Sequence, residues 1–140
     1  MSLQRIKNLC VADLMTIDPI VIGPKASVSE AEELMAAKGV SGLPVVDDHG
    51  RLIGVISQTD LLYLTRPAVR ALMTRWETPL TVAEVMTSPP VTVRTTISLE
   101  NAARVMSEHD VHRVVAVDRK GRPVGVLSAS DFVQLAAIGC

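Results

Sequence analysis

The sequence predicts a mixed α/β fold of the α+β type, with two repeats of strand-helix-strand-strand-helix packed about a pseudo-twofold axis. The first observation is a duplication at a constant offset of 71 residues, without a gap, which aligns Met15 with Met86. The second is that both copies carry the same order of apolar segments, most alike at residues 54–60 (GVISQTD) and 125–131 (GVLSASD). A register kept over some fifty residues indicates that one supersecondary unit was duplicated.

Each repeat is expected to begin with a short extended run and a capped helix. Residues 19–22 and 90–93 form the extended runs, and each starts with proline. The tetrapeptide SVSE at residues 27–30 has the pattern of a capping box, and apolar residues then recur at helical spacing. Gly39 suits the left-handed end of the first helix, whereas Asp110 holds that place in the second copy.

Two strands and a second helix complete each repeat. In the first copy we expect the strands at residues 43–47 and 52–57, with residues 48–50 (DHG) as the hairpin turn. The second helix should start near Asp60 and, in the second copy, near Asp131. A sheet of three strands with two helices cannot bury both of its faces, so the two repeats are expected to pack sheet to sheet.

These elements divide the chain into a first repeat over residues 11–66, a helical connector over 67–81 and a second repeat over 82–138. Pro67 is expected to start the connector helix. Its apolar residues fall on one helical face: Val69, Leu72, Met73 and Trp76. We therefore expect the connector to be a packed helix and not a flexible linker.

The composition narrows the possible functions. The chain has 140 residues, of which 48% are hydrophobic and only 2% aromatic, so its core must be aliphatic. A net charge of −1 gives no general attraction for nucleic acid or a membrane surface, and no apolar run is long enough to span a bilayer. Cys10, Cys140 and the three histidines lack metal-like or redox-like spacing. We expect a soluble cytoplasmic protein with no metal site and no membrane contact.

The repeated segments 54–60 and 125–131 carry the chemistry. Each is an apolar strand that ends in hydroxyls and a carboxylate where a helix starts. Amides at a helix start favour phosphate, and a carboxylate can accept both hydrogen bonds from a cis-diol. The glycine in each strand allows close approach of a ligand or of neighbouring backbone. A structural interpretation stands beside this one, because Ser57 and Asp60 also fit a plain N-cap with an acidic first turn.

Several segments resemble motifs of the CBS domain, and each occurs twice. In the first repeat these are residues 12–16 with Pro19, 43–47 and 54–60; in the second they are 83–87 with Pro90, 111–118 and 125–131. The resemblance covers the chain from about residue 11 to residue 133. It implies a tandem CBS pair, or Bateman module, which is a regulatory fold that commonly senses adenosine nucleotides and often dimerises.

The resemblance also implies roles for individual residues. Asp60 and Asp131 match aspartates that commonly hold the ribose hydroxyls. The hydroxyl residues before them match contacts to phosphate or ribose: Ser57, Thr59, Ser128 and Ser130. The segments 16–22 and 87–93, which begin at Thr16 and Thr87, would frame the base.

The two copies differ where a phosphate would lie. His112 and Arg113 of the second repeat stand where the first repeat has a serine and a glycine, and a planar guanidinium suits phosphate. Val115 replaces Pro44, so the local backbone is expected to differ. The second repeat is also less acidic than the first. We therefore expect a ligand in the second copy first, with the first site weaker or empty.

The predicted function is a non-catalytic sensor that binds AMP, ADP or ATP in the cleft between the repeats and signals to an effector protein by changed packing. The sequence has no P-loop, catalytic triad or metal cluster, so we expect no enzyme and no catalytic cofactor. The alternatives are S-adenosylmethionine, NAD(H) or nucleic acid as ligand, or a dimerisation scaffold without ligand. Apolar residues on the second helix of each repeat predict a homodimer: Leu61, Leu62, Leu64, Phe132, Val133 and Leu135.

Overall fold

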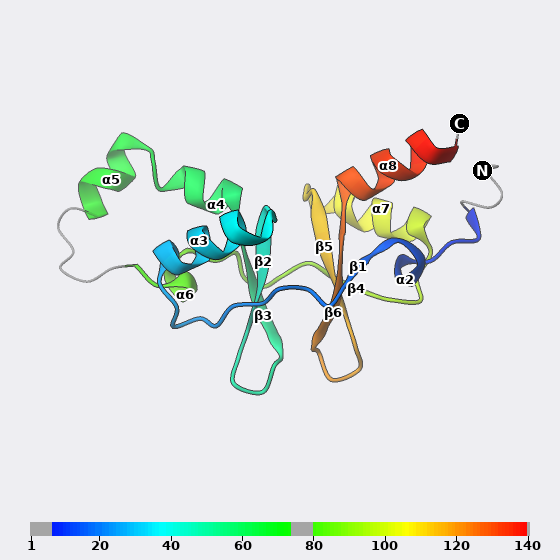
Figure 1. Ribbon diagram of the computed structural model, residues 1–140, viewed down its shortest axis with the longest axis horizontal. Coiled ribbons are helices and arrows are strands. Elements are labelled where there is room, and N and C mark those ends of the chain that lie inside the picture. Colours follow the sequence, from blue (N-terminus) through cyan, green and yellow to red (C-terminus); the bar gives the residue numbers. More distant parts are fainter. Residues whose placement is uncertain (1–6, 74–79, 140) are drawn as a thin grey trace. The chain divides into compact units, whose positions relative to one another are not determined.

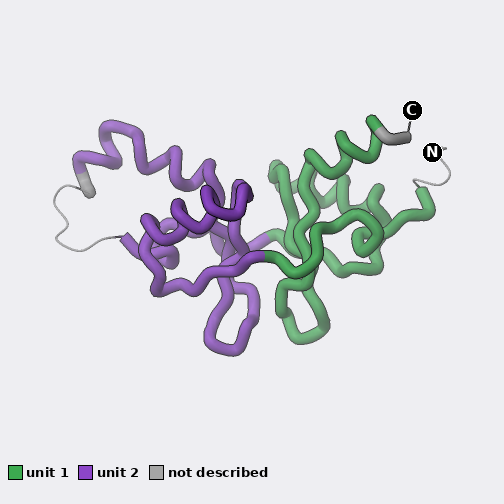
Figure 2. The backbone as a smooth tube through the Cα atoms, viewed as in Figure 1, with its two compact units in different colours: residues 1–19, 91–140 green, residues 20–90 purple. Residues whose placement is uncertain are grey.

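The computed structural model describes residues 7–73 and 80–139 and has a mixed α+β fold. Contacts within it divide the chain into two compact units. Unit 1 comprises Met1–Pro19 and Val91–Cys140, and unit 2 comprises Ile20–Pro90 (Figure 2, green and purple). Each unit therefore draws on both sequence repeats, because the amino-terminal segment of each repeat lies with the strands of the other.

Unit 2 contains a β-hairpin with helices around it (Figure 1). Its elements are α3 (Val28–Lys38), β2 (Gly42–Val46), β3 (Leu52–Ser57), α4 (Gln58–Tyr63), α5 (Pro67–Met73) and α6 (Val82–Val85). Strands β2 and β3 pair antiparallel, with Leu43 opposite Ile56. The predicted capping box of α3 is confirmed, because Ser27 Oγ accepts from the Glu30 amide while the Glu30 carboxylate accepts from the Ser27 amide.

Unit 1 repeats this plan with a more complete sheet. Its elements are α2 (Val11–Leu14), β1 (Thr16–Ile17), β4 (Thr92–Arg94), α7 (Leu99–Glu108), β5 (Arg113–Val117), β6 (Pro123–Ser128) and α8 (Ala129–Gly139). The strand order is β1-β6-β5-β4. Strand β4 runs parallel to β5, whereas the β5–β6 and β6–β1 pairs are antiparallel.

Most of the predicted boundaries lie within two residues of the observed ones, whereas the short elements α2, β1 and α6 are not expected from the sequence. Strand β3 has the predicted bounds, β2 begins one residue early, and α5 starts at Pro67. The first helix of unit 2 ends at Gly39, whose φ of 65° is left-handed as predicted. Asp110 takes a similar φ of 51° in unit 1, so an aspartate fills the position that glycine fills in the other copy. Trp76 lies outside the described residues.

The first extended run differs between the copies, and Pro44 explains why. In unit 1 this run is a strand, and the Val115 amide donates to the Val91 carbonyl at 3.2 Å. In unit 2 the equivalent contact is an isolated bridge between Ile22 and Val45. A proline has no amide hydrogen, so Pro44 cannot supply the hydrogen bond that Val115 supplies. Pro24, which stands where the second repeat has Thr95, lacks an amide hydrogen in the same way, so the predicted strand at residues 19–22 is reduced to one bridge.

The exchange of amino-terminal segments follows the same pattern in both units. In unit 1 the amides of Val11 and Ala12 donate to the carbonyls of Ile97 and Thr95, both at 3.0 Å. In unit 2 the amides of Val82 and Ala83 donate to the corresponding carbonyls, 71 residues earlier, at 2.8 and 3.0 Å. Val11 and Val82 are fully buried in the cores of the units that they join. Burial of these valines makes the short helices α2 and α6 part of the cores.

The two hairpin turns are built alike. In the turn after β2, Asp47 Oδ1 accepts hydrogen bonds from the amides of His49 and Arg51. In the turn after β5, Asp118 Oδ1 accepts from the amides of Lys120 and Arg122. The hydrogen bond from the Arg51 amide, with the other turn contacts, lowers the pKa of the Asp47 carboxyl. That from the Arg122 amide lowers the pKa of Asp118 in the same way.

The second helix of each repeat is only partly apolar on its outer side. Leu135 is 9% exposed and belongs to the unit 1 core, while Leu61 and Phe132 pack against the cores of their own units. Leu62 and Val133 are 65% and 68% exposed. The apolar stripe predicted for dimerisation is therefore divided, since Leu61, Phe132 and Leu135 complete the cores, Leu62 and Val133 are exposed, and Leu64 is half-buried.

Candidate functional site

The repeated strand-to-helix turn forms the candidate site, and in unit 2 it is a capping box. Strand β3 ends at Ser57, which is the N-cap of α4. The Ser57 amide and hydroxyl donate to Asp60 Oδ2 at 2.9 and 3.1 Å, and the Asp60 amide donates back to Ser57 Oγ at 3.3 Å. The structural interpretation of this motif is thus correct, and it occupies one oxygen of the carboxylate.

The other oxygen of Asp60 is also engaged. Thr87 Oγ1 donates to Asp60 Oδ1 at 3.0 Å, across a sequence separation of 27 residues. The backbone holds Thr87 in place, because its amide and carbonyl exchange hydrogen bonds with Val55 at 2.9 and 3.0 Å. The sequence predicts that both residues lie near a ligand, but it does not predict the hydrogen bond between them.

In the corresponding turn of unit 1, the described residues form hydrogen bonds with only one oxygen of the Asp131 carboxylate. The Ser128 amide and hydroxyl contact Asp131 Oδ2 at 2.8 and 3.1 Å, and Ser128 Oγ also lies 2.8 Å from Ser130 Oγ. Thr16 pairs with Val126 on β6, as Thr87 pairs with Val55. Within the described ranges, no hydrogen bond reaches Asp131 Oδ1 from Thr16 or any other residue. This oxygen is the main difference between the two copies.

Arg113 and His112 lie beside the unit 1 turn. Arg113 is the first residue of β5 and pairs in register with Ser128 of β6. The His112 carbonyl accepts a hydrogen bond of 2.8 Å from the Ala129 amide at the start of α8. In unit 2 the corresponding pair is Gly42 with Ser57, so the cation is specific to unit 1.

The glycines in the repeated strands admit a methionine side chain. A Cβ on Gly125 would overlap Met15 Sδ and lie 2.8 Å from Met15 Cγ. A Cβ on Gly54 would lie 2.5 Å from Met86 Sδ and 3.1 Å from the Thr87 carbonyl oxygen. The sequence predicts that a ligand or neighbouring backbone approaches these glycines. The main occupant is instead the methionine of the exchanged segment, with the Thr87 backbone beside Gly54.

The exchange decides which predicted residues come together. Unit 2 holds Ser57, Thr59, Asp60 and Thr87, and unit 1 holds Thr16, His112, Arg113, Ser128, Ser130 and Asp131. Five of these residues are half-buried: Ser57, Asp60, Arg113, Ser128 and Asp131. The others are exposed: Thr16, Thr59, Thr87, His112 and Ser130. A hydroxyl from one repeat and a carboxylate from the other thus belong to one compact unit in both cases.

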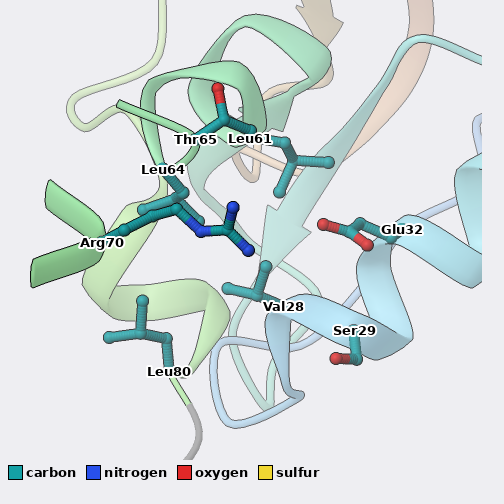
Figure 3. A pocket seen from close by; sticks show the side chains of 8 residues that line it. All are labelled: Val28, Ser29, Glu32, Leu61, Leu64, Thr65, Arg70 and Leu80. Atoms are coloured by element: carbon teal, nitrogen blue, oxygen red, sulfur yellow. The ribbon is translucent and has the colours of Figure 1, made fainter. Parts of the chain in front are cut away.

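Two pockets of the described residues lie away from these turns. One, of about 360 Å³, lies in unit 2 among α3, α4 and α5 (Figure 3). The other, of about 660 Å³, lies in unit 1 beside residues 94–96 and 117–119. Neither is lined by a predicted site residue, and no sequence motif pointed to either.

The described residues give no sign of a metal site or a membrane span. Over residues 7–73 and 80–139, no group of three or more His, Cys, Asp or Glu side chains could hold a metal ion. No helix in the same part of the chain is long and apolar enough to cross a membrane.

Comparison with known proteins identifies the family. The model of the CBS domain matches residues 11–66 and 82–137. The chain is 34% identical over 137 residues to the chloroplastic CBS domain-containing protein CBSX2 of Arabidopsis thaliana, covering 83% of this chain and 58% of that protein. It is 31% identical over 121 residues to inosine-5'-monophosphate dehydrogenase of Bifidobacterium longum, covering 86% of this chain but only 21% of the dehydrogenase.

Solved structures support the same family assignment. The fold matches CBSX2 in complex with AMP at a TM-score of 0.80 and 36% identity, over 94% of this chain and 98% of that one. It matches the CBS domain pair of protein MJ0100, in complex with 5'-methylthioadenosine and S-adenosyl-L-methionine, at a TM-score of 0.83 and 25% identity, with the same coverage. The chain belongs to the CBS domain family and contains two CBS domains in tandem.

Proposed function

We propose that this chain is a non-catalytic regulatory module that binds an adenosine nucleotide of the AMP, ADP or ATP class. The observation that carries the proposal is the unit 1 turn, where no described residue donates to the second carboxylate oxygen of Asp131 beside the hydroxyls of Ser128 and Ser130. A carboxylate oxygen of this kind accepts a hydrogen bond from a ribose hydroxyl. Relatives in complex with AMP, or with 5'-methylthioadenosine and S-adenosyl-L-methionine, support an adenosyl ligand.

Neighbouring groups bind the phosphate and the base of the nucleotide. The exposed Ser130 hydroxyl and the Arg113 guanidinium contact the phosphate, where an arginine can form two parallel hydrogen bonds. The α8 amino terminus adds the favourable end of its dipole, since α8 has eleven residues. Thr16, on the exposed β1 strand, contributes to the wall beside the base.

The unit 1 turn binds first because the unit 2 turn is already satisfied within the protein. Both oxygens of Asp60 accept hydrogen bonds, from Ser57 and from Thr87. A ribose must therefore displace the threonine before it reaches Asp60. Unit 2 also has Gly42 in place of Arg113, which removes the cation. The two turns thus differ in affinity although their sequences are alike.

Signalling follows from differential affinity. A nucleotide that binds one arrangement of the two CBS domains better than another shifts the population by that difference in binding free energy and by no more. The effect passes to an effector protein that recognises the favoured arrangement. Exposed Leu62 and Val133 support a homodimer as the assembly in which this occurs.

Isothermal titration with AMP, ADP, ATP, S-adenosylmethionine and NADH tests the proposal. We expect saturable binding of at least one adenine nucleotide, and Asp131→Asn should weaken it about tenfold or more because a hydrogen bond to charge is lost. Asn keeps an oxygen for the cap, so the fold should survive, and thermal unfolding checks this. Asp60→Asn is the matched control and should change the affinity less.

Two outcomes would refute parts of this proposal. If only S-adenosylmethionine or NADH bound saturably, the protein would have an adenosyl-binding site, but its ligand would not be AMP, ADP or ATP. If no compound of the panel bound to folded protein while a dimer persisted, the scaffold function would replace ligand sensing. A salt-dependent mobility shift of single-stranded RNA would instead support nucleic-acid binding.

A further inference from the structure

The pocket of unit 2 lies where the connector helix α5 approaches the helices of the first repeat (Figure 3). It has a volume of about 360 Å³, within the range of small-molecule sites. Four aliphatic side chains and four polar ones line it: Val28, Leu61, Leu64, Leu80, Ser29, Glu32, Thr65 and Arg70. This lining is separate from the repeated turns, so the pocket needs an explanation of its own.

The duplication supplies an internal comparison for this pocket. At the offset of 71 residues, Val28 corresponds to Leu99 and Leu61 to Phe132. In unit 1 Leu99 is fully buried and Phe132 packs against the same core. The first repeat thus has smaller side chains at positions where the second has a leucine and a phenylalanine. It also has Glu32 where the second repeat has an alanine.

Two opposite charges face this pocket from different helices. The Arg70 guanidinium comes from α5 and lies near Val28 and Leu61, and the Glu32 carboxylate of α3 points toward the guanidinium (Figure 3). Within the described ranges, no ion pair joins the two groups or links either to a third residue. Arginine and glutamate side chains that face a shared aliphatic space without pairing can each bind one end of a small zwitterion.

We propose that this pocket binds a small aliphatic amino acid. The α-carboxylate takes two hydrogen bonds from Arg70, and the α-ammonium group donates to Glu32. The aliphatic side chain of the ligand packs against Val28, Leu61 and their apolar neighbours, where burial of each methylene adds to affinity. A bound ligand would link α3 to α5 and so tie the connector to the first repeat. This second signal would be independent of the nucleotide.

Isothermal titration of the full chain with L-leucine tests the ligand class. Isocaproate lacks the ammonium group and isoamylamine lacks the carboxylate, so each removes one of the two charged contacts. We expect L-leucine to bind saturably in the millimolar range or tighter, and each analogue to bind about tenfold more weakly or worse. Titration with an adenine nucleotide on the same sample reports the other site separately.

Variants locate the binding to this pocket. Arg70→Met keeps the length of an exposed side chain and should lower leucine affinity about tenfold or more. Glu32→Gln should weaken L-leucine several-fold but leave isocaproate binding unchanged. Leu61→Phe copies the residue of the second repeat and should fill the pocket, with its fold checked by thermal unfolding. Arg66→Met, on the neighbouring turn where Arg66 stacks on the Tyr63 ring, is the matched control and should bind as the parent.

Three results would overturn the amino-acid proposal or a part of it. If L-leucine produced no saturable heat at 20 mM with a folded sample, the pocket would not be an amino-acid site. Binding that persisted in both Arg70→Met and Leu61→Phe would place the amino acid elsewhere on the protein. Stronger binding of isocaproate than of L-leucine would exclude the role assigned to Glu32.

Discussion

A substitution at Gly125 tests the exchange of segments on which both candidate turns depend. A Cβ at this position would overlap Met15 Sδ and lie 2.8 and 3.2 Å from Met15 Cγ and Cβ. Because the Met15 Cβ is itself within this distance, rotation of the methionine side chain alone does not relieve the crowding. The segment that carries Met15 must shift away from β6 when Gly125 is replaced by alanine.

Two opposing effects set the change in the free energy of unfolding of Gly125→Ala. Overpacking of this kind costs about 1–3 kcal/mol. Replacing a glycine also restricts the unfolded chain, which returns about 0.4–1 kcal/mol. We therefore expect Gly125→Ala to lower the free energy of unfolding by about 1–2 kcal/mol. Gly23→Ala is the control, since a Cβ on Gly23 meets nothing within 4 Å, and it should change stability by less than about 0.5 kcal/mol.

A double-mutant cycle then isolates the contact. Met15→Ala alone should cost about 1–2 kcal/mol, because Met15 is only partly buried against the unit 1 core. In the double variant the new Cβ on residue 125 occupies the space left by the methionine. The double variant should therefore be more stable than the sum of the single changes by about 1 kcal/mol. Urea unfolding followed by circular dichroism measures all four proteins. Additive effects of the two changes would refute the exchanged packing.

Three further predictions concern the helix ends, a hairpin and the assembly. Gly39→Ala should lose about 1 kcal/mol because its φ is 65°, whereas Asp110→Gly should gain up to about 1 kcal/mol because its φ is 51°; urea unfolding compares them. Backbone hydrogen bonds within the turn lower the pKa of Asp118, so the stability that the ionised carboxylate gives the fold should be present at neutral pH and be lost as the pH falls below the usual carboxyl range. Asp118→Ala should therefore reduce the fall of the melting temperature in acid. An unchanged acid dependence in thermal melts would contradict this role of Asp118. If Leu62 and Val133 form a dimer interface, light scattering should give a dimer mass for the parent and a monomer mass for the doubly Asp-substituted protein, and a parent monomer at every concentration would exclude the homodimer.

The fold could be predicted from the sequence because its determinants are local. The SVSE capping box, Gly39 and the DHG turn act within a few residues, and each is seen in the structure. The prediction of a strand at the start of the first repeat was wrong. Pro44 has no amide hydrogen to donate in the short parallel ladder that this strand would form. The pair on the other side of Ile22 is lost for the same reason, because Pro24 stands where the second repeat has Thr95 and also has no amide hydrogen. Propensity over residues 19–22 contains no information about the partner strand.

The exchange of amino-terminal segments could not be predicted from a duplicated sequence. Both repeats carry the same segment, so either copy of Met-Thr satisfies the pattern beside either strand. Only the chain path decides which methionine meets which glycine. The same reason hid the bond from Thr87 to Asp60, which joins two residues of different repeats. The residues of the turns were predicted, but their partners were not.

The capping and ligand-binding interpretations of the repeated aspartate are compatible, because a carboxylate has two oxygens. In both turns Oδ2 accepts from the N-cap serine and holds the start of the helix. In unit 2 the remaining oxygen accepts from Thr87, whereas in unit 1 no described residue occupies it. Thr87→Val should therefore free the Asp60 oxygen and raise nucleotide occupancy at the unit 2 turn, at a stability cost of about 1 kcal/mol. Titration that showed an unchanged stoichiometry and affinity in this variant would mean that the missing cation, and not the threonine, keeps the unit 2 turn empty.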